Sequence, residues 1–243
     1  GPRVHARENP ALSRLPMESL YCFHSIRHTT VAQSLGTLGG GNHFVEVDRD
    51  LEGKLYLVIH SGSRRLGRDV ARFHQNVAYF AANGISQEEV RKKKLRPSDI
   101  KNSPLKPERC FLTGEYLDNY LHDMNIAVDY AKLSRSLMAE TLIAALGLDV
   151  EETFATVHNY IDTDHGILRK GAVSAREGER IIIPINMRDG SLICTGRGND
   201  EWNCTAPHGS GRLMTRTQAK EEVSIEEYRR AMAGIYTTSV NES

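Results

Sequence analysis

The order of hydrophobic and polar positions divides the chain into a helical first part and a strand-rich second part. Two apolar stretches, 45–47 and 55–59, flank a charged turn at 48–53 and predict a β-hairpin. Apolar residues recur at helical spacing over 66–82 and over 114–148, where Gly147 is placed to end the longer helix. Residues 1–34 show little periodicity and predict an irregular lead-in.

The second part alternates short apolar runs with turns that contain glycine or aspartate. These runs predict strands at 154–158, 166–175, 180–184 and 191–195. Helices are expected over 212–220 and 225–233, the second started by Ser224 with Glu227 in capping-box register. A polar, lysine-rich and proline-containing stretch near 86–110 predicts a surface insertion whose charge run is a solvated face. The whole pattern favours an α+β fold with mixed or antiparallel sheets flanked by helices.

Charge and cysteine content narrow the function classes. The 31 basic and 31 acidic side chains cancel, so no global field attracts the chain to nucleic acid or to a membrane surface, and a polyanion must meet a local basic cluster. No apolar run reaches the length of a membrane span. The four cysteines show no pairing pattern, which predicts a reducing cytoplasm. Cys194 and Cys204 could ligate a metal, and buried inert thiols are the simpler interpretation.

Four histidines carry the candidate chemistry, because each lies at a strand end or in a glycine-rich turn: His43, His60, His158 and His208. Neutral imidazole is the commonest protein ligand for divalent transition metals. Ligands so far apart in sequence would meet only in the fold. The set therefore predicts a metalloenzyme. For each histidine taken alone, the alternative is a core side chain with its hydrogen bonds satisfied.

The turn at 39–41 consists of three glycines and leads into the first strand. Its backbone could lie against an anion or a nucleotide. On an ideal strand Asn42, Phe44 and Glu46 share one face and would meet the ligand, while His43 and Val45 share the other face. A plain glycine turn before a strand is the alternative.

His208 lies in a glycine-flanked turn ahead of a predicted helix, with Arg212 and Arg216 close by in sequence. A histidine there is placed to attack a phosphorus, since backbone N–H groups and arginines would meet the developing charge. Arg64, after His60, and Lys170 add basic groups near other turns. The alternative is a simple anion-binding helix start.

Five ordered segments together resemble the RtcB family of RNA-splicing ligases, over nearly the whole chain from about residue 34. They are 35–47, 58–64, 157–161, 168–173 and 206–216. The resemblance implies that 35–243 is a ligase core. It also implies joining of RNA 3′-phosphate or 2′,3′-cyclic phosphate ends to 5′-hydroxyl ends, in tRNA splicing or RNA repair. The family uses GTP and manganese (Mn²⁺) and passes through a histidine–GMP intermediate.

The same resemblance assigns roles to individual residues. His208 becomes the guanylylated nucleophile, and His43, His60 and His158 become manganese ligands. Arg64, Lys170, Arg212 and Arg216 match basic positions that serve RNA ends or phosphates. The implied guanylate pocket consists of Asn42, His43, Phe44, Val45, Glu46, His158, Asn159, Pro184, Ile185, Asn186, Met187, Ser191, His208, Gly209, Ser210 and Gly211.

Some family features have no counterpart in the sequence. Family members carry an aspartate and a cysteine upstream of the first histidine motif; nothing similar precedes Leu35, and Cys22 lacks the context. A guanine-contacting lysine would lie beyond residue 243. Asn186 stands where many members have serine, and Arg188-Asp189 replaces a Gly-Thr-like pair. The chain is therefore expected to be the central part of such a ligase, incomplete at both ends.

Two other functions stay open beside the ligase. One is a fragment that binds GTP or RNA without turnover. The other is a metal-dependent phosphoesterase with three histidine ligands, in which His208 acts as general acid.

Overall fold

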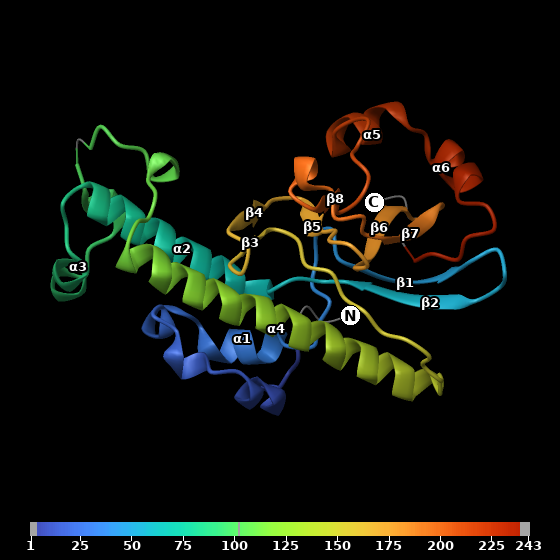
Figure 1. Cartoon of the computed structure of the whole chain (residues 1–243), viewed down its shortest axis with the longest axis horizontal. Helices are drawn as coiled ribbons and strands as arrows, with labels where there is room; N and C mark the ends of the chain where they lie inside the picture. The colour runs from blue at the N-terminus through green and yellow to red at the C-terminus, as the bar shows by residue number, and fades with distance from the viewer. Residues whose placement is uncertain (1–3, 102, 239–243) are drawn as a thin grey trace. The chain divides into compact units, whose positions relative to one another are not determined.

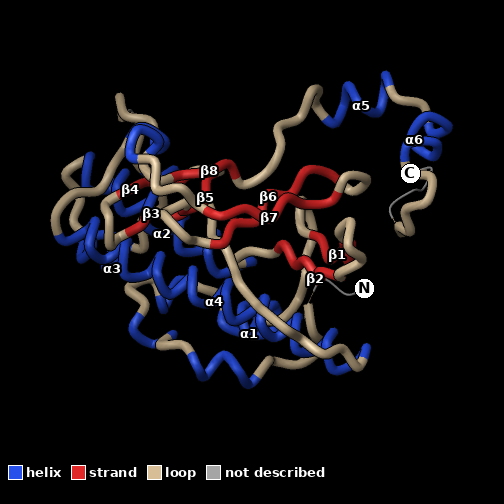
Figure 2. The backbone as a smooth tube through the Cα atoms, turned by 45° about the vertical axis from the view of Figure 1, so that its right-hand side comes forward, coloured by secondary structure: helices blue, strands red, loops and turns tan. Residues whose placement is uncertain are grey.

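The computed structural model describes residues 4–101 and 103–238, and the chain divides into two compact units, Gly1–Glu151 and Glu152–Ser243. We call them the N-terminal and C-terminal units. Helices and small antiparallel sheets are both present, in agreement with the α+β prediction (Figure 2).

Two long helices form the frame of the N-terminal unit. They are α2 (Arg64–Ala82) and α4 (Glu115–Leu146), which pack along each other (Figure 1). Both match the helical spacing of the sequence, and Gly147 ends α4 with φ +63°, as expected. The core that these helices share with the preceding segment consists of Met17, Leu20, Cys22, Ile26, Val31, Leu35, Leu66, Val70, Ile126, Ala127 and Tyr130.

The segment expected as an irregular lead-in contains short helices and contributes to this core. Three 3₁₀ turns, η1 (Pro10–Arg14), η2 (Met17–Ser19) and η3 (Phe23–Ser25), precede helix α1 (His28–Ser34). Asp123 of α4 accepts hydrogen bonds from the backbone N–H groups of Tyr21 and Cys22, at 2.9 and 3.1 Å. Such short turns carry little periodicity, so contacts with α4 rather than local pattern define this segment.

The predicted hairpin is present as β1 (Phe44–Arg49) and β2 (Leu55–His60), paired antiparallel with Phe44 opposite His60. Residues 44, 46 and 48 are half-buried and residues 45, 47 and 49 are exposed. The expected division of faces is therefore confirmed for the residues within the strand.

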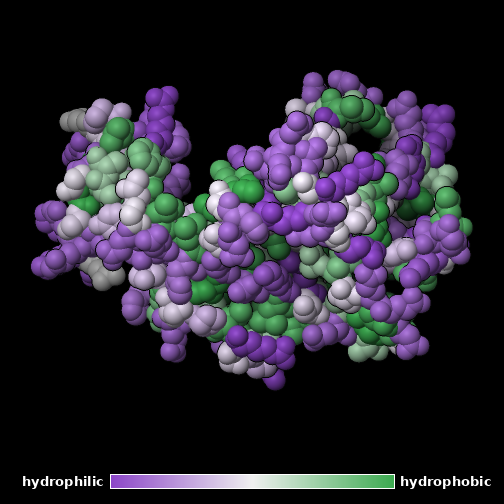
Figure 3. All heavy atoms as spheres, in the orientation of Figure 1, coloured by the Kyte–Doolittle hydropathy of each residue, from purple (hydrophilic) through white to green (hydrophobic). Residues whose placement is uncertain are grey.

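The lysine-rich stretch near 86–110 contains helix α3 (Gln87–Lys93) and the turns η4 (Pro97–Asp99) and η5 (Pro107–Arg109). Lys92 and Lys93 pair with Glu88 and Glu89 at i,i+4 spacing on an exposed surface. The two lysines thus lie on a solvated face, as expected. Hydrophilic side chains, in purple, cover most of the face of the molecule seen in Figure 3.

The C-terminal unit is built from short paired strands. β3 (Tyr160–Asp162) pairs with β4 (Ile167–Arg169), β5 (Ala172–Ser174) with β8 (Thr205–Pro207), and β6 (Arg180–Asn186) with β7 (Gly190–Thr195). The 3₁₀ turn η6 (Asp200–Trp202) precedes β8. The small core consists of Val173, Ala175 and Ile181, with Ile183, Cys194 and Ala206 packed against it.

Three expectations for this unit are corrected. No strand forms over 154–158; the first one begins at Tyr160, after Asn159 adopts φ +62°. The stretch 166–175 is broken into β4 and β5 because Gly171 has φ +64°. The helix expected from 212 is α5 (Arg216–Glu222), since Thr215 caps it. The last helix, α6 (Ile225–Ala231), begins with the predicted Ser224–Glu227 capping box.

Two further observations bear on the sequence analysis. All four cysteines are free thiols, as the lack of a pairing pattern predicted. Among the described helices, none combines the length and apolar character that crossing a bilayer requires.

Candidate functional site

The glycine turn of the N-terminal unit is shaped around Arg64. Gly39 has φ +79°, and a Cβ atom placed on it would overlap the Arg64 guanidinium. By contrast, nothing lies within 4 Å of such an atom on Gly40. The turn therefore favours glycine at position 39 through its left-handed backbone, and a side chain there would have to displace the end of the Arg64 side chain. Burial lowers the pKa of Arg64, against a smaller opposing effect of Tyr130.

His43 is oriented by the main chain of this turn. Its Nδ1 lies 2.8 Å from the carbonyl oxygen of Leu38, which also accepts from Ser61 Oγ at 3.2 Å. A carbonyl can only accept, so in the neutral ring Nδ1 carries the proton and Nε2 has the lone pair. This arrangement is common behind metal-ligating histidines. Nε2 is therefore the nitrogen of His43 that a metal ion could bind.

His60 faces His43 across the hairpin, with ring centroids 6.2 Å apart, and its ring packs against the edge of Phe44 at 5.2 Å. A metal–nitrogen bond is about 2 Å long, so two rings on one ion have centroids within about 6.5 Å. The separation of the two rings lies near the upper end of this range. Within either unit, no set of three or more His, Cys, Asp or Glu side chains among the described residues could hold an ion.

Arg135 is a residue of this region that sequence reasoning missed. Its Nη1 donates to the Ser61 carbonyl oxygen at 3.1 Å, directly after His60, and burial lowers its pKa. The neighbouring Ser134 accepts from the backbone N–H of Gly36 at 3.0 Å. Helix α4 thereby holds both loops that carry the histidines. No sequence signal marks Arg135, because polar residues occur along the whole length of this helix.

His208 of the C-terminal unit is held by the same kind of contact. Its Nδ1 lies 2.7 Å from the Gly171 carbonyl oxygen, so in the neutral ring Nδ1 carries the proton and Nε2 has the lone pair. A Cβ on Gly171 would lie 3.2 Å from His208 Cε1, which leaves little room for a side chain there. The ring of His158 lies beside that of His208, with centroids 4.5 Å apart.

His158 is arranged differently from His43. Asn159 Oδ1 accepts from the backbone N–H of Gly171 at 2.6 Å, which directs the Asn159 amide N–H toward His158 Nδ1 at 2.8 Å. Nδ1 of His158 is therefore the accepting nitrogen. In this arrangement the lone pair of His158 is already engaged, and metal binding would require the Asn159 amide to turn away.

The implied pocket residues of the C-terminal unit gather where β6 ends. Ser210 donates to Pro184 and Ile185 carbonyls through its N–H (3.0 Å) and its hydroxyl. Pro184 pairs with Ser191 in the sheet. A Cβ on Gly209 would lie 3.2 Å from the Pro184 carbonyl oxygen. The turn after His208 is thus closely packed on the end of β6, and the Ser210 N–H already has a partner.

Asn186, expected where many family members have serine, closes its own turn. It accepts from the backbone N–H groups of Arg188 and Asp189 and donates to the Asp189 carboxylate at 2.7 Å. Hydrogen bonds from Arg188 and Asn186 lower the pKa of Asp189 to about 2. Met187 is exposed. This turn is therefore stabilised by its own side chains.

The remaining predicted residues are placed as follows. Phe44, Val45 and Glu46 lie on β1 and Asn42 just before it, in the N-terminal unit. Lys170, Gly211 and Arg212 are exposed in the C-terminal unit, and Arg212 lines an open depression with Leu213, Met214, Thr215 and Gln218. The Arg216 side chain lies outside the described part of the structure.

Two of the cysteines, Cys22 and Cys204, are poor metal ligands in this arrangement. Cys22 is fully buried, and burial followed by the Asp123 carboxylate raises the pKa of its thiol. Desolvation and then Asp200 raise the pKa of the Cys204 thiol. Metals bind the thiolate, so a protonated thiol is disfavoured as a ligand.

A family model described as tRNA-splicing ligase RtcB matches residues 15–242. The chain belongs to this family. The match begins within the segment that was expected to be a lead-in.

The curated relatives agree with that assignment. The RNA-splicing ligase RtcB of Escherichia coli strain K12 is 34% identical over 226 residues, which cover 86% of this chain and 52% of that protein. The tRNA-splicing ligase RtcB of Aeropyrum pernix is 29% identical over 264 residues, with 86% and 51% covered. The chain spans about half the length of these relatives. No solved structure matches it significantly.

Proposed function

We propose that this chain carries the nucleotidyl-transfer step of an RNA ligase that uses GTP and manganese. The ligase would join RNA 3′-phosphate or 2′,3′-cyclic phosphate ends to 5′-hydroxyl ends in tRNA splicing or RNA repair. Family membership and the names of the relatives support the ligase part. The observation that carries the nucleotidyl step is the hydrogen bond from His208 Nδ1 to the Gly171 carbonyl oxygen.

That hydrogen bond supplies what a nucleophilic histidine needs. The lone pair on Nε2 would attack the α-phosphorus of GTP, a new N–P bond would form, and the bond to pyrophosphate would break. The ring gains positive charge as the bond forms, and the Gly171 carbonyl stabilises that charge through Nδ1–H. His208 is then a histidine–GMP intermediate, ready to pass the nucleotide to an RNA 3′ end.

The other proposed roles follow the family resemblance. His43, His60 and His158 would each be a manganese ligand, His158 after the Asn159 amide turns away, and Arg64, Lys170, Arg212 and Arg216 would bind phosphates. Bound manganese would neutralise the charge of the triphosphate. The residues around the end of β6 and the start of β1 would bind guanylate. Free cysteines are compatible with the cytoplasmic setting that we propose.

The test is covalent labelling of the chain by α-³²P-GTP with manganese, in the parent protein, in His208→Ala and in His24→Ala. His24 is exposed and lies in the other unit, so its variant is the matched control. Label is expected in the parent and in the control and is absent from His208→Ala. The labelled bond should hydrolyse in acid and survive in alkali, as a phosphoramidate does.

Other outcomes identify the alternatives. GTP binding without label, in a folded and metal-loaded chain, would assign a binding fragment. Hydrolysis of a phosphodiester without GTP, lost in His60→Ala, would assign the phosphoesterase. Either result would overturn the proposed nucleotidyl step.

A further inference from the structure

We propose that Arg169 is a positioning residue for His208: it holds together the two chain segments that carry His208 and Gly171, and so keeps His208 in the Nδ1–H tautomer. The inference rests on the proposed function only in its catalytic consequence, since the tautomer can be measured without GTP or metal. No role was assigned to Arg169 on sequence grounds.

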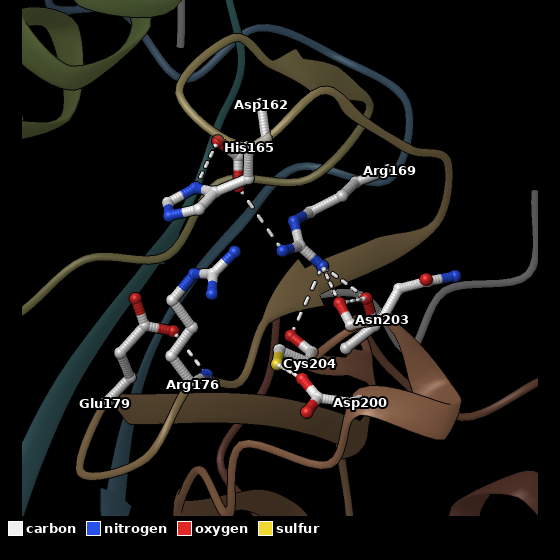
Figure 4. Close-up of polar contacts among 9 residues, drawn as sticks. Asp162, His165, Arg169, Arg176, Glu179, Asp200, Asn203 and Cys204 are labelled. Atoms are coloured by element: carbon white, nitrogen blue, oxygen red, sulfur yellow. Dashed lines mark hydrogen bonds and ion pairs between the residues drawn. The ribbon is translucent and has the colours of Figure 1, made fainter.

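Arg169 is the largest fully buried side chain of the chain's described part, with 1% of its surface exposed. Its Nη1 donates to the carbonyl oxygens of Asn203 and Cys204, both at 3.3 Å, and to the Thr205 hydroxyl. Its Nη2 donates to Asp162 at 3.3 Å. Figure 4 shows the guanidinium pointing between Asp162 and the loop that carries Asn203 and Cys204.

The acceptors of Arg169 lie in strained backbone. Asn203 and Cys204 have φ values of +49° and +46°, a left-handed conformation at two consecutive non-glycine residues. Such residues are each disfavoured by about 1–2 kcal/mol and persist when the surroundings hold them. Arg169 donates to both carbonyls, and the Cys204 carbonyl also accepts from Ala175 N at 2.7 Å. The guanidinium therefore fixes the backbone that leads into β8.

Both partners of the His208 hydrogen bond are close neighbours of this cluster. Strand β8, entered at Thr205, ends at Pro207, immediately before His208. Arg169 itself ends β4, two residues before Gly171. Its backbone thus leads to the acceptor, and its side chain holds the segment that leads to the donor. Pairing of β5 with β8, with Ala172 opposite Pro207, completes the connection.

The charges in the cluster are paired by Asp162. Burial acts to raise the pKa of Asp162, but hydrogen bonds from His165 and Arg169 outweigh it and lower that pKa below its usual value. The Arg169 charge is therefore countered within the cluster. Even so, the Arg169 Nε is buried and has no hydrogen-bond partner among the described residues. An unpaired buried Nε destabilises the fold. We therefore explain Arg169 by the backbone that it positions at Asn203 and Cys204 rather than by stability alone.

The experiment compares three variants of the full chain: Arg169→Met, Arg169→Lys and Arg180→Met. Arg180→Met is the matched control, because Arg180 lies in the same unit and pairs with Glu152 on the surface. The first measurement is the tautomer of His208, from long-range ¹H–¹⁵N NMR at alkaline pH with no metal or nucleotide. The second is the rate of labelling by α-³²P-GTP.

We expect the parent and Arg180→Met to hold His208 as the Nδ1–H tautomer. In Arg169→Met a second tautomer appears and labelling slows about 10- to 100-fold, as for other residues that orient a histidine. Arg169→Lys keeps the charge but cannot span the separate acceptors. Its effect therefore falls between those of Arg180→Met and Arg169→Met. An unchanged His208 tautomer in a folded Arg169→Met would overturn the proposal.

Two further results keep the proposal separable from folding and from the proposed function. Thr205→Val removes one acceptor with little change in volume; if Arg169→Met does not fold, this variant and Arg169→Lys decide by the same two measurements. If the parent is not labelled at all, the proposed function fails, while the tautomer still confirms or refutes the role of Arg169.

Discussion

The two units hold a histidine by the same contact but build the support for it differently. In each, the ring Nδ1 donates to a main-chain carbonyl, of Leu38 for His43 and of Gly171 for His208. The N-terminal support is a large apolar core with long helices. The C-terminal support has a small core and a buried Asp162–Arg169 cluster. Where little apolar surface is available, a network of hydrogen bonds replaces it as the source of rigidity.

The largest effect that would sharpen this comparison is expected for Asp123→Ala. Asp123 is fully buried and accepts from Tyr21 N, Cys22 N and His74 Nε2, the last at 2.9 Å. Removing it leaves buried donors without an acceptor, which costs about 3–5 kcal/mol. Urea unfolding should show this loss of stability in the N-terminal unit. Residues 10–25 are expected to detach from the core first.

Asp129→Ala serves as the control for that variant. Asp129 also lies on α4 but forms only an exposed pair with Lys132. Equal unfolding midpoints for the two variants would show that the Asp123 contacts do not hold the lead-in.

Acid is expected to weaken both units. Burial acts to raise the pKa of Asp123, but hydrogen bonds from His74 and from Tyr21 and Cys22 outweigh it, so its pKa in the folded state is lowered. Asp162 is lowered as well. A carboxylate with a lowered folded pKa stabilises the fold above its unfolded value of about 3.9, and this stability is lost as the pH falls through the folded value.

The measurement is the unfolding free energy from pH 6 down to pH 2 in the parent, Asp123→Asn and Asp162→Asn. In each variant the unfolding free energy should fall less steeply between pH 6 and pH 2 than it does in the parent. If the unfolding free energy of both variants falls as steeply as that of the parent, other carboxylates cause the acid sensitivity.

A smaller effect is expected for Gly39→Ala. The substitution forces an alanine into φ +79° and displaces the Arg64 guanidinium, at a cost of about 1–2 kcal/mol. Gly40→Ala is the control, since Gly40 has ordinary φ and open space around its Cβ position. Thermal unfolding midpoints of the two variants should differ; matching midpoints would show that the backbone at position 39 does not require glycine.

The smallest change in stability is expected for Gly171→Ala. This substitution should also lower the rate of labelling by GTP. Its strain, about 1 kcal/mol, equals that of Gly178→Ala, because both glycines have positive φ. Of these two glycines, only Gly171 has His208 within 4 Å of its Cβ position. We therefore expect similar losses of stability and a labelling rate that falls about 10-fold in Gly171→Ala alone. Equal labelling rates in the two variants would show that Gly171 has no role in the labelling of His208.

The features that the sequence predicted well are local ones. The hairpin faces, the long helix with Gly147 and the Ser224 cap each depend on residues a few positions apart, which a linear pattern contains. The strand predicted at 154–158 was wrong because alternation alone did not reveal the left-handed Asn159.

The supports of the candidate site could not be predicted, because they join residues far apart in sequence. Arg135 meets Ser61 across 74 positions, and Arg169 meets Thr205 across 36. Their side chains carry no spacing that would mark them. The roles of His43, His60, His158 and His208 themselves stay predictions.

The contacts to Leu38 and Gly171 have a consequence for mutational mapping. Both histidines are anchored on peptide carbonyls, which every residue type possesses. An alanine scan leaves the Leu38 oxygen in place, and family-wide sequence variation at that position would carry no trace of its role. Replacing the amide that follows Leu38 or Gly171 with an ester, which makes the carbonyl a weaker acceptor, would expose a contribution that side-chain genetics does not detect.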